Sequence, residues 1–274
     1  QVGRLVREGA VDGIEAEAVL AVGESQSAAF LTTYVNEVDP SAGAYDGFLV
    51  HSRFGAAAPL DGASIFGGNA EPEVVPFRPD LRVPVLTVIT ETDLIGGFRA
   101  GYYRARQPDD DKLRVWEIPG TAHADTYTIR GGFIDSGRAS IEELASVYAP
   151  TKELMGQRLS YSINFAPQHH YVLQAAIAHV DGWVRTGTPA PAAEPMALTD
   201  GDPPALDLDA NGLARGGVRT PWVDVPIART SGLAPTETLM SFLFGSGEVF
   251  DIETLRSLYP GGPADYLERF TAAL

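Results

Sequence analysis

The stretch Ala18–Ala29, which reads AVLAVGESQSAA, constrains the fold of this chain more than any other segment. Its apolar run Val19–Val22 predicts a buried strand that stops at Gly23. Small residues and a predicted helix follow directly. A strand, a sharp turn and a helix are the context of a nucleophile elbow, in which the residue at the tip of the turn has a strained backbone. That residue is Ser25.

The residues beside the tip of the turn meet the steric demands of an elbow. The neighbours two positions away on each side must be small, and here they are Gly23 and Ser27. Ser25 is expected to project its hydroxyl above the sheet, near the positive end of the following helix. The backbone N–H of Gln26 is expected to point at a developing oxyanion. The simpler alternative is that Ser25 caps the helix. Glu24 is expected either to tune the pocket or to be an exposed turn carboxylate.

Composition excludes several classes of function. The formal net charge of −16, with no basic stripe, argues against a nucleic-acid partner and disfavours an anionic membrane. The absence of cysteine excludes disulfides, thiolate metal sites and cysteine nucleophiles. No apolar run approaches the roughly 20 residues of a spanning helix, so a soluble protein is expected. Neither a signal peptide nor a transit peptide is recognisable, and the compartment, cytoplasmic or secreted, stays open. The preference for Arg over Lys hints at a GC-rich bacterial genome.

Strands that alternate with helices predict an α/β domain with a mostly parallel sheet flanked by helices. Further buried strands are predicted at Tyr45–His51, Val83–Ile89 and Leu113–Ile118, and a strongly amphipathic helix at Val172–Val184. Other helices are predicted at Val2–Val11, Ser27–Val38, Gly96–Arg106, Ile141–Tyr148, Ile252–Leu258 and Ala264–Ala273.

The domain organisation follows from the breaks in these patterns. Residues 1–190 are expected to form the core, with long loop or lid insertions at 52–82 and 126–165. A segment rich in proline and alanine then opens residues 191–274, a predicted C-terminal extension that packs on the core. Within it, Thr220–Pro226 resembles an edge strand, because its prolines cannot donate to a ladder.

Three polar residues each follow a predicted strand: Ser25, Asp93 and His123. Sites in parallel sheets lie at that edge. A serine hydroxyl needs a base, usually a histidine that a carboxylate orients, and the order serine, acid, histidine is the one this fold requires. Glu91 is an alternative acid, although we favour Asp93. The simpler roles are a helix-terminal acid for either carboxylate and a loop histidine bonded to a carbonyl for His123.

Other polar residues have weaker assignments. Arg53 is expected at the active edge, where it binds an acidic substrate group or, as we favour, pairs with a surface carboxylate. His169 and His170 precede a predicted helix, so one of them is expected to cap it or line the pocket. A metal site is not expected without carboxylates in register. The sequence has no P-loop, dinucleotide fingerprint or EF-hand loop, so we expect no cofactor.

These motifs together resemble the α/β-hydrolase family, and within it a bacterial group of alpha/beta hydrolase domain proteins. The resemblance covers nearly the whole chain. It rests on GESQSA around Ser25, YDGFLVHSR at Tyr45–Arg53, VPVLTVITETD at Val83–Asp93, EIPGTAHAD at Glu117–Asp125, HVDGWVRTGTPAP at His179–Pro191 and GGVRTPWVDVP at Gly216–Pro226. It implies that Ser25 is the nucleophile, Asp93 the acid and His123 the base, and that the Gln26 N–H serves the oxyanion hole. The implied activity is hydrolysis of a small carboxylic ester.

The chain departs from the family pattern in one respect. An α/β hydrolase has several strands before the elbow strand, whereas here the elbow strand is almost the first element. The second oxyanion donor belongs to those earlier strands. We therefore expect a C-terminal portion of the fold, with an exposed strand edge that a second chain or a missing N-terminal segment completes.

The sequence therefore predicts a serine esterase that works through an acyl-enzyme. An acyltransferase or an amidase with the same triad is the alternative within enzymes. A catalytically inactive binding or scaffold subunit is the alternative outside them.

Overall fold

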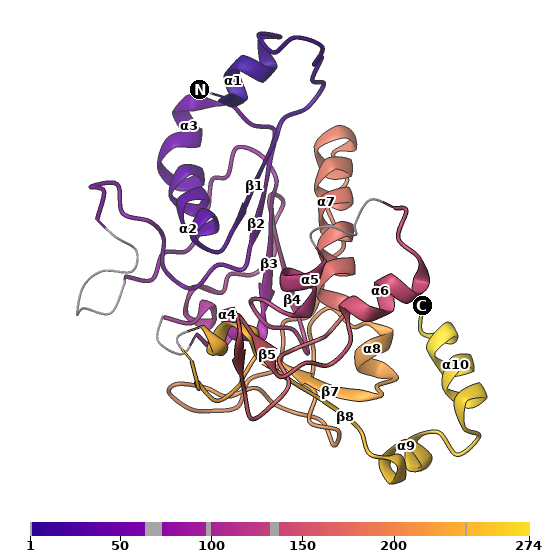
Figure 1. The fold of residues 1–274 in the computed structure, drawn as a ribbon. Helices are drawn as coiled ribbons and strands as arrows, with labels where there is room; N and C mark the ends of the chain where they lie inside the picture. Colours follow the sequence, from indigo (N-terminus) through magenta and orange to yellow (C-terminus); the bar gives the residue numbers. More distant parts are fainter. Residues whose placement is uncertain (1, 64–72, 97–99, 132–136, 239) are drawn as a thin grey trace. The chain divides into compact units, whose positions relative to one another are not determined.

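The computed structural model describes residues 2–63, 73–96, 100–131, 137–238 and 240–274 (Figure 1). The helices are α1 (Val2–Arg7), α2 (Gln26–Thr33), α3 (Asp39–Ala42), α4 (Glu91–Ile95), α5 (Thr126–Arg130), α6 (Ile141–Val147), α7 (Gln168–Thr186), α8 (Pro221–Asp224), α9 (Ile252–Leu258) and α10 (Pro263–Ala272). The strands are β1 (Leu20–Glu24), β2 (Gly47–His51), β3 (Val85–Thr90), β4 (Leu113–Ile118), β5 (Glu153–Leu154), β6 (Gln157–Arg158), β7 (Ala228–Ser231) and β8 (Ser246–Val249).

The main sheet has the order β1-β2-β3-β4, in which β1 pairs parallel with β2 and β2 with β3. Every residue of β2 and β3 is buried. Near-continuous apolar strands of this kind are typical of parallel sheets that are covered on both faces. The sheet and its flanking helices confirm the predicted α/β fold.

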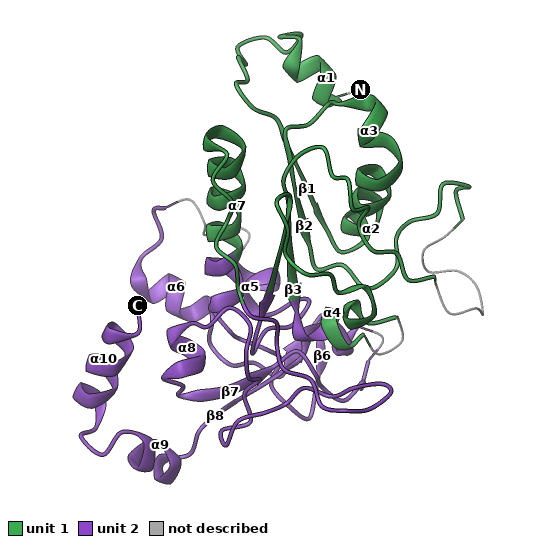
Figure 2. Ribbon diagram, turned by 180° about the vertical axis from the view of Figure 1, so that it is seen from behind, with its two compact units in different colours: residues 1–89, 93–116, 173–193 green, residues 90–92, 117–172, 194–274 purple. Residues whose placement is uncertain are grey.

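Two compact units make up the chain, coloured separately in Figure 2. The first contains Gln1–Ile89, Asp93–Trp116 and Leu173–Ala193, and the second contains Thr90–Thr92, Glu117–Val172 and Glu194–Leu274. The predicted division at residue 190 stays a prediction. None of the helices in the described ranges has the length and apolar character needed to cross a membrane.

In the first unit, helices cover both faces of β1 and β2. The helix α2 packs on one face, where its Ala28 joins a core with Phe48 and Val50 of β2. The helix α7 covers the other face, because Gly47 lies against Val180 and Val184 (Figure 1). Both helices lie in segments that the sequence predicts to be helical. Each packs closely on a glycine of the sheet, α2 on Gly23 and α7 on Gly47.

The strand β1 is the outermost strand of the described sheet. Its Val22 is 59 % exposed, unlike the buried residues of β2. Phe30 on α2 is 54 % exposed as well. Large apolar side chains are thus left in solvent around the edge strand that carries the elbow.

The second unit has two antiparallel hairpins, β5-β6 and β7-β8, that the sequence patterns do not predict. Its core contains Ala124, Leu154, Leu159, Ile163 and Phe244. The helices α6, α9 and α10 confirm the predictions for those segments. The predicted edge strand at Thr220–Pro226 is wrong: the segment forms α8, because a proline at the first turn of a helix lacks only an N–H that would have no partner there.

The region after β3 also differs from the prediction. The chain enters α4 directly, so both candidate acids are helical residues. The helix predicted at Gly96–Arg106 is wrong for residues 100–106, where a 3-10 turn spans Tyr102–Ala105; residues 97–99 lie outside the described ranges. The helix predicted at Ser27–Val38 does not end at Pro40, because a π-helical turn, Tyr34–Val38, leads into α3.

Candidate active site

Ser25 forms the tip of the turn between β1 and α2, with φ 55° and ψ −117°. A non-glycine residue in such a region costs about 1–3 kcal/mol, a strain that clusters at functional sites. The turn is held by the Ser25 N–H, which donates to the carbonyl of His51 at 3.1 Å. Ser25 occupies the N-cap position of α2, but its side chain makes no capping hydrogen bond with the helix.

Gly23 makes the turn sterically possible. A Cβ atom at this position would lie 2.7 Å from the carbonyl oxygen of Ser27 and 3.1 Å from the Cβ of Leu31. Real Cβ atoms do not approach backbone this closely, so the first turn of α2 would have to move. The demand for a small residue two positions before Ser25 therefore has a direct structural cause.

Gly23→Ala is expected to lower kcat/KM for the nucleophilic reaction predicted for Ser25 roughly tenfold to a hundredfold, because an ångström of misplacement has an effect of that order. Folding stability should fall by about 1–3 kcal/mol. Gly182→Ala in α7 is the matched control, since a Cβ there meets nothing within 4 Å. The control should keep its activity and gain up to about 1 kcal/mol. Equal kcat/KM values for the two variants would contradict this role of Gly23.

The neighbours of Ser25 have different environments. Gln26 is the first residue of α2, and the first N–H groups of a helix have no acceptor within it. Such a group suits the predicted oxyanion donor. Glu24 ends β1 with its side chain exposed. Its predicted effect on a pocket stays a prediction.

Asp93 and His123 are both buried and both follow strands of the main sheet. Asp93 is the third residue of α4 after β3, and it is 0 % exposed. His123 follows β4 and is 6 % exposed. Ser25 and Asp93 belong to the first compact unit and His123 to the second. The triad of these three residues stays a prediction.

Glu91, the alternative acid, is engaged elsewhere. Its Oε1 accepts a hydrogen bond from the Gly120 N–H at 2.6 Å. Its Oε2 accepts from the Ser231 hydroxyl at 2.8 Å and from the Gly232 N–H at 2.7 Å. Burial raises the pKa of Glu91 above its ordinary value, and these three donors oppose that rise.

Glu91→Gln is expected to flatten the pH dependence of folding stability. Because the pKa of Glu91 is raised in the folded chain, the folded state retains a proton that the unfolded state releases from about pH 4.5 upward. Retention of this proton stabilises the folded state. The stabilisation is complete below the ordinary pKa of a glutamate and is lost as the pH rises through the raised pKa of Glu91. Urea unfolding of both proteins across this range checks the prediction. An identical slope would contradict it.

Arg53 lies inside the first unit rather than at its surface. It is 0 % exposed, and it donates to the carbonyl oxygens of Gly55 and Val75 at 3.3 and 2.5 Å. Its guanidinium carbon lies 4.9 Å from the ring centroid of Phe77, and burial lowers its pKa to about 10. The predicted pairing with a surface carboxylate is wrong, because the side chain is buried and donates to backbone carbonyl oxygens instead. Its part in binding an acidic substrate stays a prediction.

His169 and His170 lie in the first turn of α7 rather than before the helix. The Nδ1 atom of His169 is 3.1 Å from the Oδ2 atom of Asp125, and both residues are buried. The ring of His170 stacks on Tyr127 with centroids 4.1 Å apart. Within the described ranges, no group of three or more His, Cys, Asp or Glu residues is arranged to hold a metal. Substrate contact by either histidine stays a prediction.

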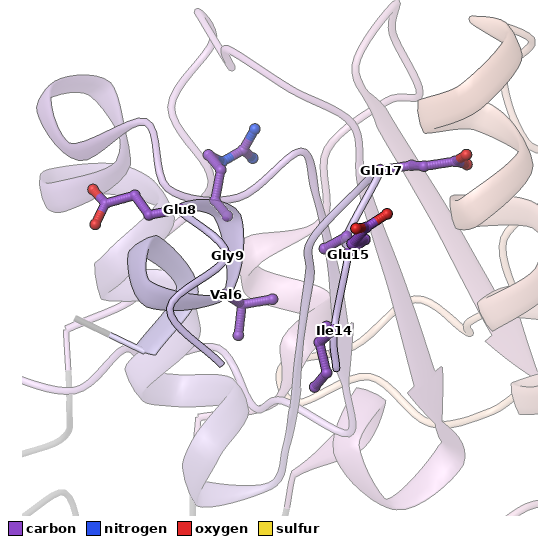
Figure 3. A pocket seen from close by; sticks show the side chains of 8 residues that line it. Val6, Glu8, Gly9, Ile14, Glu15 and Glu17 are labelled. Atoms are coloured by element: carbon purple, nitrogen blue, oxygen red, sulfur yellow. The ribbon is translucent and has the colours of Figure 1, made fainter. Parts of the chain in front are cut away.

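A surface hollow of about 360 Å³ lies beside α1 and the segment that leads into β1 (Figure 3). It is lined by Val6, Arg7, Glu8, Gly9, Ile14, Glu15, Ala16 and Glu17. All of these precede β1, whereas Ser25 follows it. The five residues of β1 span about 16 Å, so the hollow is too far from Ser25 to hold a molecule that reacts with its hydroxyl.

Comparisons with known proteins give one match. Neither the curated proteins nor the solved structures contain a match to this chain. The family described as alpha/beta hydrolase domain matches residues 1–274. The parallel sheet and the strand–turn–helix around Ser25 agree with that match. The chain therefore belongs to the alpha/beta hydrolase domain family.

Proposed function

We propose that this protein is a serine hydrolase that cleaves carboxylic esters through an acyl-enzyme. The backbone of Ser25 carries the proposal, because φ 55° and ψ −117° are costly for a serine. An ordinary serine in a strand-to-helix turn gains nothing from such strain. Membership of the alpha/beta hydrolase domain family supports a hydrolase in general. The ester substrate and the triad are our proposal.

In the proposed mechanism, the Oγ atom of Ser25 attacks the ester carbonyl carbon while the imidazole of His123 accepts the hydroxyl proton. The oxyanion that forms receives a hydrogen bond from the Gln26 N–H. The bond to the leaving alcohol then breaks, and His123 returns the proton to that alcohol. Water, which His123 deprotonates, attacks the carbonyl carbon of the acyl-enzyme. The bond to the Oγ atom of Ser25 then breaks, and His123 returns the proton to that oxygen as the acid leaves.

We assign the acid of the triad to Asp93. Both carboxylate oxygens of Glu91 already accept hydrogen bonds from Gly120, Ser231 and Gly232. A carboxylate committed to three donors is poorly suited to orient an imidazole as well. Asp93 lies two residues beyond Glu91 in α4 and is fully buried, and we therefore assign it as the acid.

A pair of substrates tests the reaction class. The wild-type protein is expected to hydrolyse p-nitrophenyl acetate and to leave p-nitroacetanilide intact, because an ester has the better leaving group. Faster cleavage of the anilide would mean that the protein is an amidase rather than an esterase. Preferential transfer of the acetyl group to an added alcohol would indicate an acyltransferase. A protein that turns over neither substrate would favour the scaffold alternative.

We propose further that the outer edge of β1 accepts a strand from polypeptide outside residues 1–274. The Ser25 N–H points to His51 of β2, so by alternation the backbone groups of Leu20, Val22 and Glu24 face away from β2. Val22 is also exposed, and an edge strand whose backbone groups face away from its sheet is a template for another strand. Because such a strand ends beside Ser25, the loop after it is placed to bring the second oxyanion donor.

Native mass spectrometry of the protein purified from the cells that make it tests this partner. A mass above the 29.2 kDa of this chain is expected, either as a complex or as a longer polypeptide. A lone chain of 29.2 kDa would contradict the partner. It would leave the role of Ser25 intact, provided that this chain hydrolyses the ester.

A further inference from the structure

Glu91 and Thr92 directly follow β3, and the side chains of both reach the segment that carries His123. We infer that they are positioning residues, which hold this segment and thereby fix His123 for the proposed reaction, on which the inference rests. Their hydrogen bonds converge on Ser231 and Gly232. We call these four residues, Glu91, Thr92, Ser231 and Gly232, the Glu91–Thr92 clamp.

The carboxylate of Glu91 joins two segments of the second unit. One oxygen accepts from the Gly120 N–H at 2.6 Å, three residues before His123. The other accepts from Ser231 and Gly232 at 2.8 and 2.7 Å. Glu91 is 1 % exposed. Hydrogen bonds to a carboxylate in so dry an environment are strong, so the bend after β4 is tied firmly to the end of β7.

The hydroxyl of Thr92 acts on His123 itself. Its Oγ1 atom accepts a hydrogen bond from the backbone N–H of His123 at 3.1 Å. The same hydroxyl donates to the carbonyl of Gly232 at 2.6 Å. Donation to Gly232 orients the lone pair that receives the His123 N–H. One side chain therefore sets the position of the His123 backbone.

Gly232 is the common anchor, and its surroundings leave no space for a side chain. A Cβ atom there would lie 2.4 Å from the Thr92 nitrogen and 2.5 Å from the carbonyl oxygen of Thr121. Backbone lies on both sides, so no rotamer relieves the overlap. The end of β7 is thus wedged between the segments after β3 and β4. Residues of the predicted C-terminal extension become part of the support for His123.

Thr92→Val tests the clamp, because valine keeps the shape of threonine and removes the hydroxyl. We expect kcat for p-nitrophenyl acetate to fall roughly tenfold to a hundredfold, the effect of a displacement of about 1 Å, while KM changes little. Thr92→Ser keeps the hydroxyl and should recover most of the lost kcat. If Thr92→Val has the kcat of the wild type, or Thr92→Ser fails to recover it, the inference is overturned.

Glu91→Gln and Glu117→Gln form a second, matched pair. Glu117 is also 1 % exposed, and its Oε2 atom accepts from the Met196 N–H at 2.7 Å, outside the clamp. Both variants should show a lower Tm, since the amide replaces one oxygen that accepts hydrogen bonds from buried donors by an NH2 group. Only Glu91→Gln should lower kcat, by roughly tenfold or more. An equal loss of kcat in both would mean that general loosening, not the clamp, is responsible.

The kcat of Ser25→Ala, measured beside these variants, distinguishes a failure of the proposed function from a failure of the inference about Glu91 and Thr92. If Ser25→Ala keeps the wild-type rate, the proposed function fails and the inference fails with it. If Ser25→Ala is inactive while the variants of Glu91 and Thr92 keep the wild-type kcat, only the inference fails. The expected result is a large loss in Ser25→Ala and a smaller, kcat-specific loss in the clamp variants.

Discussion

Ser25→Ala is expected to lose roughly a thousandfold or more in kcat/KM for p-nitrophenyl acetate. The change removes the one oxygen that forms the covalent bond to the acyl group, so no acyl-enzyme can form. Fold and stability should be nearly retained, because Ser25 is only partly buried and alanine fits in the same space. Steady-state hydrolysis and a thermal melt measure both quantities.

Ser27→Ala is the matched control for this variant. Ser27 lies two residues further on, and its side chain is exposed on α2. Alanine is as small as the turn requires, so the strained geometry survives. We expect nearly the wild-type rate. Comparable losses in the two variants would mean that the turn, rather than the Ser25 hydroxyl, matters.

Asp93→Asn is expected to lower kcat roughly a thousandfold to ten-thousandfold, the range seen when a triad acid is replaced by its amide. An amide at this position stabilises the wrong tautomer of His123 and cannot balance the imidazolium that forms. The shape of the side chain is unchanged, so KM should change far less. Steady-state kinetics with p-nitrophenyl acetate check both values.

The comparison with Glu91→Gln decides which carboxylate is the acid. We expect the larger loss in Asp93→Asn, because Glu91 acts only through the position of the segment that carries His123. A loss that is larger in Glu91→Gln would reverse the assignment. It would also mean that the contacts of Glu91 with Gly120 and Gly232 are secondary to contact with the imidazole.

Local patterns predicted the elements that lie around the elbow. The apolar runs at Tyr45–His51 and Leu113–Ile118 contain the strands β2 and β4, as expected. The small residue at position 23 has the steric cause that an elbow implies. The strands and the elbow turn depend on residues that are close in sequence, so side-chain size and hydrophobic periodicity are enough to predict them. The fold class follows from the same local signals.

Features that depend on distant partners were not predictable in this way. Glu91 is held by Gly232, 141 residues away, and Thr92 by the same residue at a separation of 140. No spacing in the sequence signals these contacts. The hairpin of β7 and β8 was missed for a related reason, since its short strands are separated by 14 residues that contain no tight turn signal. Arginine is usually a surface residue, whereas Arg53 is buried and donates to the carbonyl oxygen of Val75, 22 residues away.

Reaction with a serine-directed phosphonate, followed by mass spectrometry of the digested protein, tests most directly whether Ser25 is an activated nucleophile. We predict a single phosphonyl adduct on the peptide that contains Ser25, and loss of ester hydrolysis in proportion to labelling. An adduct at another residue, or full hydrolysis by a protein that carries no adduct, would contradict the account.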